Sequence, residues 1–433
     1  MRPSTGRART PMIWLYRWLT LLCGPLINLL LWRRKLAGKE DPERITERKG
    51  LSQAIRPRGR LLWVHAASVG EALSALPMVQ ELIRRKPDLN VLITTGTVSS
   101  ARVLAKKLPE RTTHQFVPID RTPWVRRFLD HWRPDMAIWI ESELWPNLML
   151  ETAGRSIPMA LVNGRISERS YQRWRLGQRS IKQLLSCFRV ILAHDKQSAE
   201  FFRKFGAPQT ACVGDLKQAS DPLPADEAEL ARLQAAIGSR PVWLAASTHS
   251  GEEESVHKIH KKLRKQFPGL LSIIAPRHAD RGAMIAKQFA IGGLNVARRS
   301  AGEMPTHNAD IYLADTMGEM GLIYRLAAIA FVGGSLAPHG GQNPLEPARL
   351  GCAILHGPHI GNFASIYADL DSAGAARQIN DDALLADAIA MLLRDKQAAA
   401  SRGRAGKAVA ITGRDKVLEN IIAAIEPLLP EPS

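Results

Sequence analysis

Cysteine is scarce in this chain, and motifs for metal or nucleic acid are missing. The 433 residues include four cysteines, and no two of them form a CxxC pair or join a His/Cys cluster. This spacing favours neither a zinc site nor a disulfide framework, and it suits a reducing, cytoplasmic compartment. Because no set of histidines or carboxylates has metal-ligand spacing and no nucleic-acid-binding motif is recognisable, we expect no metal, no cofactor and no nucleic-acid partner.

Acidic residues are also in short supply. The chain has 59 Lys and Arg against 41 Asp and Glu, a formal net charge of +18. By itself this excess indicates an anionic partner and leaves open whether that partner is nucleic acid, a phosphorylated lipid or a membrane surface. With 45% hydrophobic residues in a chain of this length, two domains with sizeable cores are expected.

The one long apolar run lies at the N-terminus, in residues 12–32. Sixteen of its 21 residues are apolar or aromatic, and basic residues flank it on both sides. The run just reaches the roughly 20 residues that a spanning helix needs, so it predicts a membrane segment that either crosses the bilayer or lies in its interface. No small-residue cleavage site follows, which favours an uncleaved anchor, and the Arg-Arg-Lys after the run favours a cytoplasmic body. A buried N-terminal helix is the alternative.

Short apolar runs alternate with helical patterns through the rest of the chain. This rhythm predicts parallel sheets with helices on both faces, interrupted by a Pro- and Asp-rich linker at residues 219–228. Two doubly wound domains are therefore expected, with the cleft between them as the default active site. The expected strands cover residues 61–66, 90–95, 114–119, 136–141, 158–163, 189–194 and 210–214, then 242–247, 270–276, 310–315, 329–334 and 353–357.

Ligands of such sheets bind where strands end and helices begin, and five turns of this kind stand out. They are "HAASVGE" (65–71), "WIESELWPN" (139–147), "ASTHSGEEE" (246–254), "APRHADR" (275–281) and "FVGGSLAPHGGQNPLEPARLG" (331–351). In the first, a helix N-terminus would favour an ionised Glu71, although a Glu at a helix start is also common for structural reasons. Arg277, in the fourth turn, is a candidate anion ligand.

The fifth turn is the richest. Its two Gly-Gly pairs, 333–334 and 340–341, would let the backbone approach a ligand. Asn343-Pro344-Leu345-Glu346 has the form of a helix start with Asn as N-cap, and its amides and positive dipole end would favour a phosphate. A capping box alone is the structural alternative. Together with "DTMGEMGLIYRLA" (315–327), these turns predict a nucleotide-type pocket in the second half of the chain.

These motifs, in this order and approximate spacing, resemble those of the 3-deoxy-D-manno-oct-2-ulosonic acid (Kdo) transferases of lipopolysaccharide synthesis. The resemblance covers nearly the whole chain and implies a GT-B fold. It implies a membrane-anchor segment at 1–37, an acceptor-binding Rossmann-like domain at 38–220, and a CMP-Kdo-binding one at 221–433 whose last helix packs back on the first domain. The implied reaction is an inverting, metal-independent transfer of Kdo from CMP-Kdo to lipid IVA, on the cytoplasmic side of the inner membrane.

The resemblance also implies roles for single residues. Glu71 would be the general base, and burial in the closed cleft would offset the effect of the helix dipole on its basicity. Glu141 and Lys217 match positions that support the transition state. The implied CMP-Kdo ligands are Pro276 with Arg277, Met317-Gly318-Glu319, and Asn343 to Glu346, with Glu346 as an acceptor for ribose hydroxyls.

Two other functions remain as alternatives at this stage. One is a GT-B transferase that uses another nucleotide sugar, and the other is a basic, membrane-tethered protein that binds polyanions. The basic segment 164–185, which carries Tyr171 and Trp174 among its Arg and Lys residues, would suit docking onto lipid phosphates. It would equally suit a solvated helix face.

Overall fold

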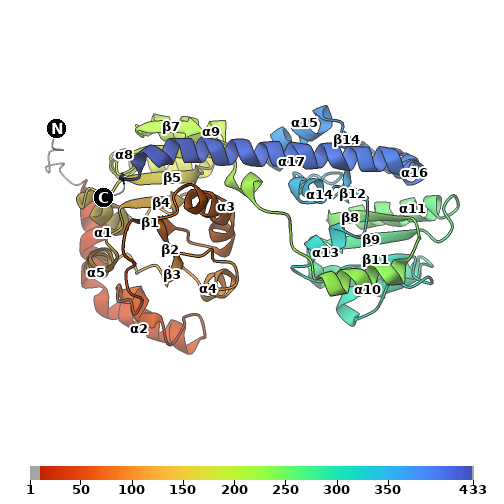
Figure 1. The fold of residues 1–433 in the computed structure, drawn as a ribbon. Coiled ribbons are helices and arrows are strands. Elements are labelled where there is room, and N and C mark those ends of the chain that lie inside the picture. Colours follow the sequence, from red (N-terminus) through yellow and green to blue (C-terminus); the bar gives the residue numbers. More distant parts are fainter. Residues whose placement is uncertain (1–9, 432–433) are drawn as a thin grey trace. The chain divides into compact units, whose positions relative to one another are not determined.

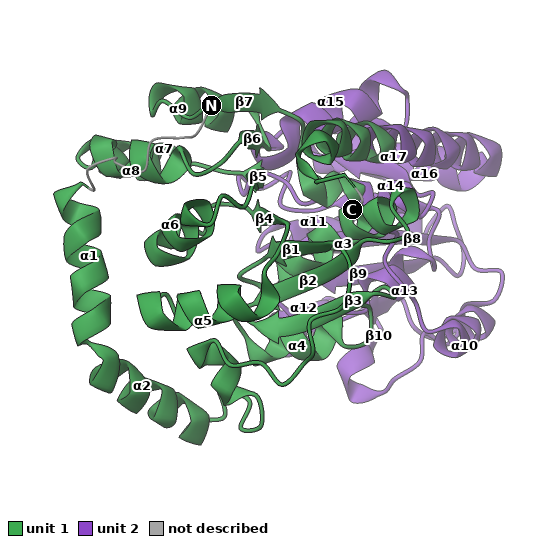
Figure 2. Cartoon of the chain, turned by 60° about the vertical axis from the view of Figure 1, so that its left-hand side comes forward, with its two compact units in different colours: residues 1–220, 414–433 green, residues 221–413 purple. Residues whose placement is uncertain are grey.

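The computed structural model describes residues 10–431 and divides into two compact units. Unit 1 comprises residues 1–220 and 414–433, and unit 2 comprises residues 221–413 (Figure 2). Each unit is built on a seven-stranded sheet, and all pairings in both sheets are parallel. The expected α/β class with two Rossmann-like sheets is confirmed, whereas the functions assigned to the two domains stay predictions.

Unit 1 has the strand order β3-β2-β1-β4-β5-β6-β7, so β1 lies at the point where the order reverses (Figure 1). Its strands are β1 (Leu61–His65), β2 (Asn90–Thr95), β3 (Thr112–Phe116), β4 (Met136–Ile140), β5 (Met159–Gly164), β6 (Val190–Ala193) and β7 (Gln209–Cys212). Its helices are α1 (Pro11–Leu22), α2 (Gly24–Leu36), α3 (Val69–Arg85), α4 (Val98–Leu104), α5 (Thr122–Trp132), α6 (Pro146–Gly154), α7 (Glu168–Arg175), α8 (Gln178–Leu185) and α9 (Lys196–Lys204).

The period-2 geometry of a strand explains how β1 builds two cores. Leu62 and Val64 join the cluster that includes α3, while Leu61 and Trp63 join the cluster that includes α5 and α8. All five residues of β1 are buried, as expected for a parallel strand with helices on both faces. A buried side chain such as Trp63 contributes about 1.5–3 kcal/mol or more by leaving water.

Unit 2 repeats the plan with the strand order β10-β11-β9-β8-β12-β13-β14, which places β8 at the reversal point. Its strands are β8 (Val242–Thr248), β9 (Leu271–Pro276), β10 (Val296–Arg298), β11 (Ile311–Leu313), β12 (Ile329–Val332), β13 (Ala353–His356) and β14 (Ala376–Gln378). Its helices are α10 (Glu227–Ile237), α11 (Glu252–Leu263), α12 (Gly282–Ile291), α13 (Met320–Tyr324), α14 (Leu345–Arg349), α15 (Ala364–Ser372), α16 (Asp382–Arg394) and the first part of α17 (Lys396–Ile425).

Two edge strands of unit 2, β10 and β14, are absent from the sequence prediction. Each has three residues, too few to show an alternating pattern. The last turns of α17 belong to unit 1, where Val417, Ile421 and Ile425 join the core that contains Leu62 and Val64.

The N-terminal apolar run forms two helices, α1 and α2, which meet at a bend of 64° next to Gly24-Pro25. Among the described residues, no single helix is long and apolar enough to cross a membrane. Taken together, the two helices of this bent pair have the length and the composition to do so. The buried-helix alternative holds only for one side of the pair, because Ile13, Arg17 and Leu31 are buried. The large exposed apolar residues of the pair are Met12, Trp14, Leu15, Trp18, Leu19, Leu21, Leu22, Leu26, Leu29, Leu30, Trp32 and Leu36.

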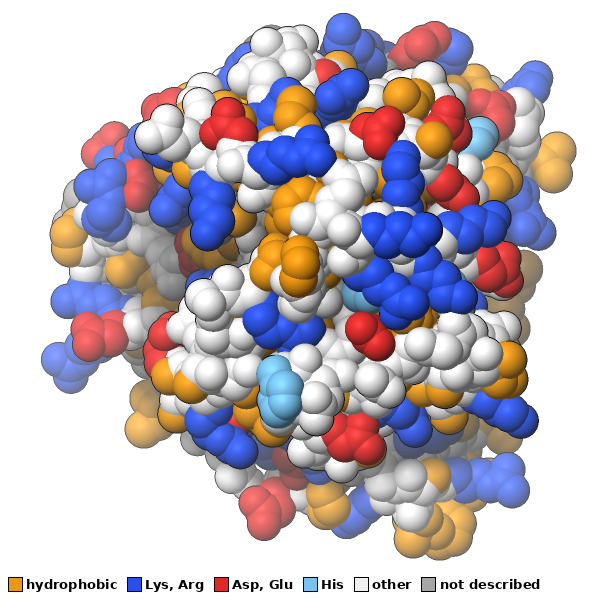
Figure 3. All heavy atoms as spheres, turned by 90° about the vertical axis from the view of Figure 1, so that its right-hand side faces the viewer, with side chains coloured by type: hydrophobic (Ala, Val, Ile, Leu, Met, Phe, Trp, Pro, Cys, Tyr) orange, Lys and Arg blue, Asp and Glu red, His pale blue; other side chains and the backbone are white. Residues whose placement is uncertain are grey.

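The face of the molecule drawn in Figure 3 differs from this helix pair. Basic and acidic side chains are spread over it, several basic ones lie together, and hydrophobic side chains occur in small patches between the polar groups. The α1–α2 pair therefore concentrates exposed apolar surface in a way that an ordinary solvated face does not, which is typical of an interaction surface.

Candidate active site

Glu71 lies in the first turn of α3, directly after β1, the strand at which the order of the sheet reverses. Ser68 is the N-cap of the helix, and its hydroxyl donates to one Glu71 carboxylate oxygen at 2.8 Å. The amide of Ala67 donates to the other carboxylate oxygen at 2.8 Å. The arrangement is a capping box, so the structural explanation of Glu71 holds. It leaves each carboxylate oxygen with a further lone pair, so the structural role does not exclude a chemical one.

The surroundings of Glu71 make it a stronger base than an exposed glutamate. The residue is only 8% exposed, and burial raises the pKa of its carboxyl group above the usual value. The hydrogen bonds from Ser68 and Ala67 oppose this rise, while the negative charges of Glu141 and Glu143 add to it. The direction of the shift is the one that a general base working near neutral pH needs.

Glu141 and Lys217 lie at the same end of the sheet. Glu141 follows β4, next to β1, and its φ of 59° is unusual for a residue other than glycine. Its carboxylate lies 3.7 Å from the ammonium group of Lys217, which belongs to the 3-10 turn Leu216–Ala219. The structure thus brings together the three residues that the sequence singles out in unit 1, because Glu141 is also close enough to influence Glu71 electrostatically.

Two further residues of this site are missing from the predicted set. Glu143 raises the pKa of Glu71, and its carboxylate accepts a hydrogen bond from the indole of Trp145 at 2.8 Å. Asn163, at the end of β5 with φ 59°, accepts a hydrogen bond from the amide of Leu216 at 2.9 Å and so positions the turn that carries Lys217. Asn at a strand end, a residue that tolerates the left-handed region, is the signal that could have indicated this position.

In unit 2, the positive charge of Arg277 influences the carboxyl group of Glu346. Pro276 ends β9, and Arg277 is exposed, with its amide bonded to the carbonyl of Thr248 at 3.0 Å. Its charge acts on Glu346 of α14, lowering the pKa of that carboxyl group against the larger opposite effect of burial. The net result is a raised pKa for Glu346.

The turn Met317-Gly318-Glu319 offers a ligand mainly main-chain groups. Gly318 has φ 86°, and Met317 is 73% exposed. The carboxylate of Glu319 accepts hydrogen bonds from the guanidinium of Arg299 at 2.6 and 3.1 Å, and this pairing lowers the pKa of Glu319. Thr316 also donates to Glu319. The Glu319 side chain therefore stabilises the turn, and the groups left for a ligand are mainly main-chain ones.

The helix start predicted at Asn343 differs in detail. Pro344, not Asn343, is the N-cap residue, and α14 begins at Leu345 and has only five residues. The side chain of Asn343 still accepts a hydrogen bond from the amide of Leu345 at 3.1 Å and donates to Glu346 at 3.4 Å. So short a helix has a weak dipole, since few peptide units add up, and a phosphate site at this position stays a prediction.

The Gly333-Gly334 pair has a structural reason within the protein. A Cβ on Gly333 would lie 2.7 Å from the carbonyl oxygen of Ser247 and 2.8 Å from the Glu252 carboxylate, so the backbone here packs closely against the protein itself. Close approach of a ligand to this pair stays a prediction. Glu252 accepts hydrogen bonds from five main-chain amides, at distances between 2.7 and 3.4 Å. The donors are the amides of His249, Gly334, Ser335, Leu336 and Ala337.

Histidines from three turns meet beside this loop. The rings of His249 and His339 stack at 4.2 Å, and His278 approaches His249 edge-on at 6.0 Å. Burial, together with the neighbouring His339, lowers the pKa of His249. Among the residues described by the structure, no group of three or more His, Cys, Asp or Glu side chains has the arrangement of a metal site.

Each of the two units is a parallel seven-stranded sheet of Rossmann-like topology, and two such units in one chain are the fold of the GT-B class. Solved structures agree on the fold: the UDP-GlcNAc 2-epimerase from Neisseria meningitidis matches with a TM-score of 0.56 at 10% identity, over 85% of this chain and 100% of that one.

The chain belongs to the 3-deoxy-D-manno-octulosonic acid transferase family. The family profile described as "3-Deoxy-D-manno-octulosonic-acid transferase (kdotransferase)" matches residues 43–220. The 3-deoxy-D-manno-octulosonic acid transferase of Rickettsia bellii is 34% identical over 88% of this chain and 91% of its own length. A probable mitochondrial enzyme of the same name from Arabidopsis thaliana is 36% identical over 94% of both chains. Membership of this enzyme family sets aside the alternative of a polyanion-binding protein.

Proposed function

We propose that this protein is an inverting, metal-independent transferase that moves Kdo from CMP-Kdo to lipid IVA, with Glu71 as the general base. The names of its relatives support the transferred sugar. The base assignment rests on one observation above all: Glu71 is buried at the carboxyl end of β1, where burial and the negative charges of Glu141 and Glu143 raise its pKa.

In the proposed reaction, a hydroxyl oxygen of the acceptor sugar attacks the anomeric carbon of Kdo. The Glu71 carboxylate takes the proton of that hydroxyl as the new C–O bond forms. The bond from the anomeric carbon to the phosphate oxygen breaks, and CMP leaves with the electron pair as a phosphate monoester. One displacement inverts the anomeric configuration, and no general acid is needed because the leaving group is stable as an anion.

Charge is the second requirement, because negative charge grows on the departing phosphate. Lys217, held at 3.7 Å from Glu141, is the proposed source of positive potential in unit 1, and Glu141 orients it. In unit 2, Arg277 is the proposed ligand of the phosphate. We assign main-chain groups of Pro276, the Met317-Gly318-Glu319 turn and the stretch Asn343-Pro344-Leu345 to the cytidine and its ribose, with Glu346 accepting from ribose hydroxyls.

The α1–α2 pair is the proposed attachment to the cytoplasmic face of the inner membrane. Its exposed tryptophans and leucines suit the interfacial region of a bilayer, and Arg33, Arg34 and Lys35 at its end suit anionic headgroups. The same surface would bring the enzyme to an acceptor that is itself a membrane lipid.

The test is transfer from CMP-Kdo to lipid IVA by the purified protein in detergent with EDTA, with the anomeric configuration of the product determined by NMR. We expect an inverted product from the wild-type protein. In Glu71→Gln, kcat should fall by about two orders of magnitude or more, since a general base contributes roughly 10²–10⁴-fold.

Glu81→Gln is the matched control, because Glu81 is a glutamate of the same helix that is paired with Arg84 and Arg85. It should retain the wild-type rate. Equal rates in Glu71→Gln and the wild type would remove Glu71 from its role, and a requirement for metal would overturn the metal-independent mechanism. A preference for a UDP-sugar over CMP-Kdo would favour the alternative GT-B enzyme.

A further inference from the structure

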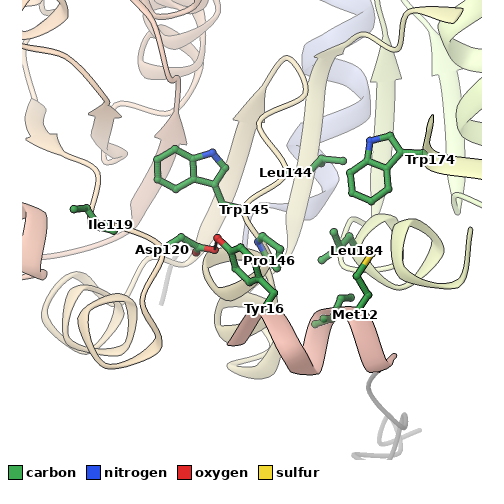
Figure 4. Close-up of a pocket in the computed structure, with 10 residues that line it drawn as sticks. Met12, Tyr16, Ile119, Asp120, Leu144, Trp145, Pro146, Trp174 and Leu184 are labelled. Carbon is green, nitrogen blue, oxygen red and sulfur yellow. Dashed lines mark hydrogen bonds between the residues drawn. The ribbon is translucent and has the colours of Figure 1, made fainter. Parts of the chain in front are cut away.

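A cavity of about 490 Å³ opens in unit 1 between α1, the turn after β4 and the α7–α8 segment. Figure 4 shows side chains from these three segments converging on it. The main contributors are Met12, Ile13 and Tyr16 of α1, Leu144 and Trp145 of the turn, and Trp174 of α7. Its volume lies in the range of about 300–1,000 Å³ that is typical of sites for small ligands.

The hydroxyl and carboxylate groups in the wall of the cavity already have hydrogen-bond partners. The hydroxyl of Tyr16 donates to the carboxylate of Asp120 at 2.9 Å, and the same carboxylate accepts from the amides of Asn147 and Leu148 at 3.0 and 2.7 Å. Most of the remaining wall is aromatic or aliphatic. A polar ligand would lose its hydration here without gaining partners, so the cavity favours an apolar one.

The wall of α1 is held firmly against unit 1. In addition to the Tyr16–Asp120 hydrogen bond, Arg17 forms an ion pair with Glu151 at 2.5 Å, and both side chains are about nine-tenths buried. The cavity is therefore built by the fold of unit 1 and is not a gap beside a loosely placed helix.

The cavity and the proposed base are linked through one turn. Trp145, in the cavity wall, donates its indole N–H to Glu143, whose charge raises the pKa of Glu71. Glu141 opens the same turn. A ligand in the cavity would therefore lie next to the segment that carries two of the carboxylates of the site.

The surfaces next to the cavity indicate which kind of molecule could place an apolar group in it. On one side lies the exposed apolar face of α1 and α2. On the other, α7 and α8 expose basic side chains around Trp174, namely Arg169, Arg173, Arg175, Arg179 and Lys182. An apolar cavity between an apolar face and a cluster of cations is complementary to a lipid with anionic headgroups.

We propose that this cavity binds one acyl chain of the phosphorylated lipid acceptor and so positions the acceptor sugar beside Glu71. The inference rests on the proposed function, which supplies the lipid acceptor. It adds a specificity site: the enzyme would recognise its acceptor by an acyl chain held in unit 1 as well as by the sugar and its phosphates.

The first test compares Met12→Glu with Met391→Glu, using an acylated and a chemically deacylated acceptor in detergent. Both methionines lie on helices, with 47% and 39% of their surface exposed, but only Met12 lines the cavity. We expect Met12→Glu to lower the ratio of kcat/KM for the acylated over the deacylated acceptor by at least tenfold. Met391→Glu should leave both values at the wild-type level. An unchanged ratio in Met12→Glu would overturn the proposal.

A second measurement keeps the two proposals separable. Brominated lauric acid should quench the tryptophan fluorescence of the wild-type protein saturably, because Trp145 and Trp174 line the cavity. Met12→Glu should weaken this binding at least tenfold, and Met391→Glu should not. Absence of transfer by the wild-type protein would reject the proposed function, whereas equal quenching curves for the two variants would reject the acyl-chain site.

Discussion

The turns after β1 and β8 occupy the same place in the two units but use a glutamate differently. Both strands lie at the point where the order of their sheet reverses, and both lead into a helix that carries a glutamate in its first turn. In unit 1, Glu71 accepts side-chain and main-chain hydrogen bonds from Ser68 and Ala67. In unit 2, Glu252 is 2% exposed and accepts from five main-chain amides.

The difference shows that a glutamate at a strand-to-helix turn does not define a base. A carboxylate that accepts hydrogen bonds from five main-chain amides, four of them in a neighbouring loop, holds that loop in place. A carboxylate with two donors, burial and two negative neighbours has both a free lone pair and a raised pKa. The base role proposed for Glu71 therefore has a feature that Glu252 lacks, a carboxylate with room for a further hydrogen bond.

The largest effect on stability should come from Glu252→Ala. The substitution leaves five amides without their acceptor, and we expect the free energy of unfolding to fall by about 3 kcal/mol or more. Urea denaturation of the full chain measures the loss, and faster hydrogen exchange of residues 334–337 should accompany it. The control is Glu254→Ala, an exposed neighbour in the same helix turn, which should change stability by less than about 0.5 kcal/mol. An equal loss of unfolding free energy in the two variants would show that the Glu252 carboxylate has no special structural role in its turn.

A smaller effect, on rate alone, is expected from Lys217→Gln. Lys217 lies beside Glu141 in unit 1, and removal of its charge should lower kcat by about tenfold or more while the KM for acceptor changes little. Lys217→Arg should restore part of the rate because it keeps the charge. Lys107→Gln, at an exposed lysine of the same unit, serves as the control. A wild-type rate in Lys217→Gln would show that Glu71 works without this cation.

The smallest effect concerns pH. Because Glu71 must be ionised to accept a proton, kcat/KM should fall as the pH drops through its pKa, which burial raises above that of an ordinary glutamate. Glu143→Gln removes one of the charges that raise this pKa, so the acid limb of the profile should move to lower pH. An acid limb that stays in place would mean that another group controls it.

Much of unit 1 follows from local sequence. Ser68 and Glu71 are three residues apart, as a capping box requires, so their contact can be predicted without any tertiary information. Glu141 is predicted at the end of β4 because parallel strands end at one edge of the sheet. The left-handed backbone conformation of Glu141 depends on neighbouring strands and cannot be predicted from local sequence. The same holds for Asn163, whose side chain positions the turn that carries Lys217.

Unit 2 was harder to predict for the same reason. The Gly333-Gly334 pair has the pattern of a ligand-binding loop, and only the folded chain shows that the amide of Gly334 donates a hydrogen bond to Glu252. The five-residue helix α14 begins one residue after its expected start, since Pro344 supplies the cap position. The edge strands β10 and β14 are too short for periodicity to reveal them.

By itself, the sequence determined the alternation that builds two parallel sheets and the strand ends at which Glu71 and Glu141 lie. These depend on periodicity and on contacts within a few residues. The family and the choice of Lys217 follow from the resemblance of motifs along the chain. The tertiary structure decided which glutamate keeps a free lone pair. The hydrogen-bond donors to the Glu71 carboxylate come from three and four residues away, whereas four of the five donors to the Glu252 carboxylate come from 82 to 85 residues away. Partners at that distance meet only when β8 and β12 pair, and no local pattern encodes them.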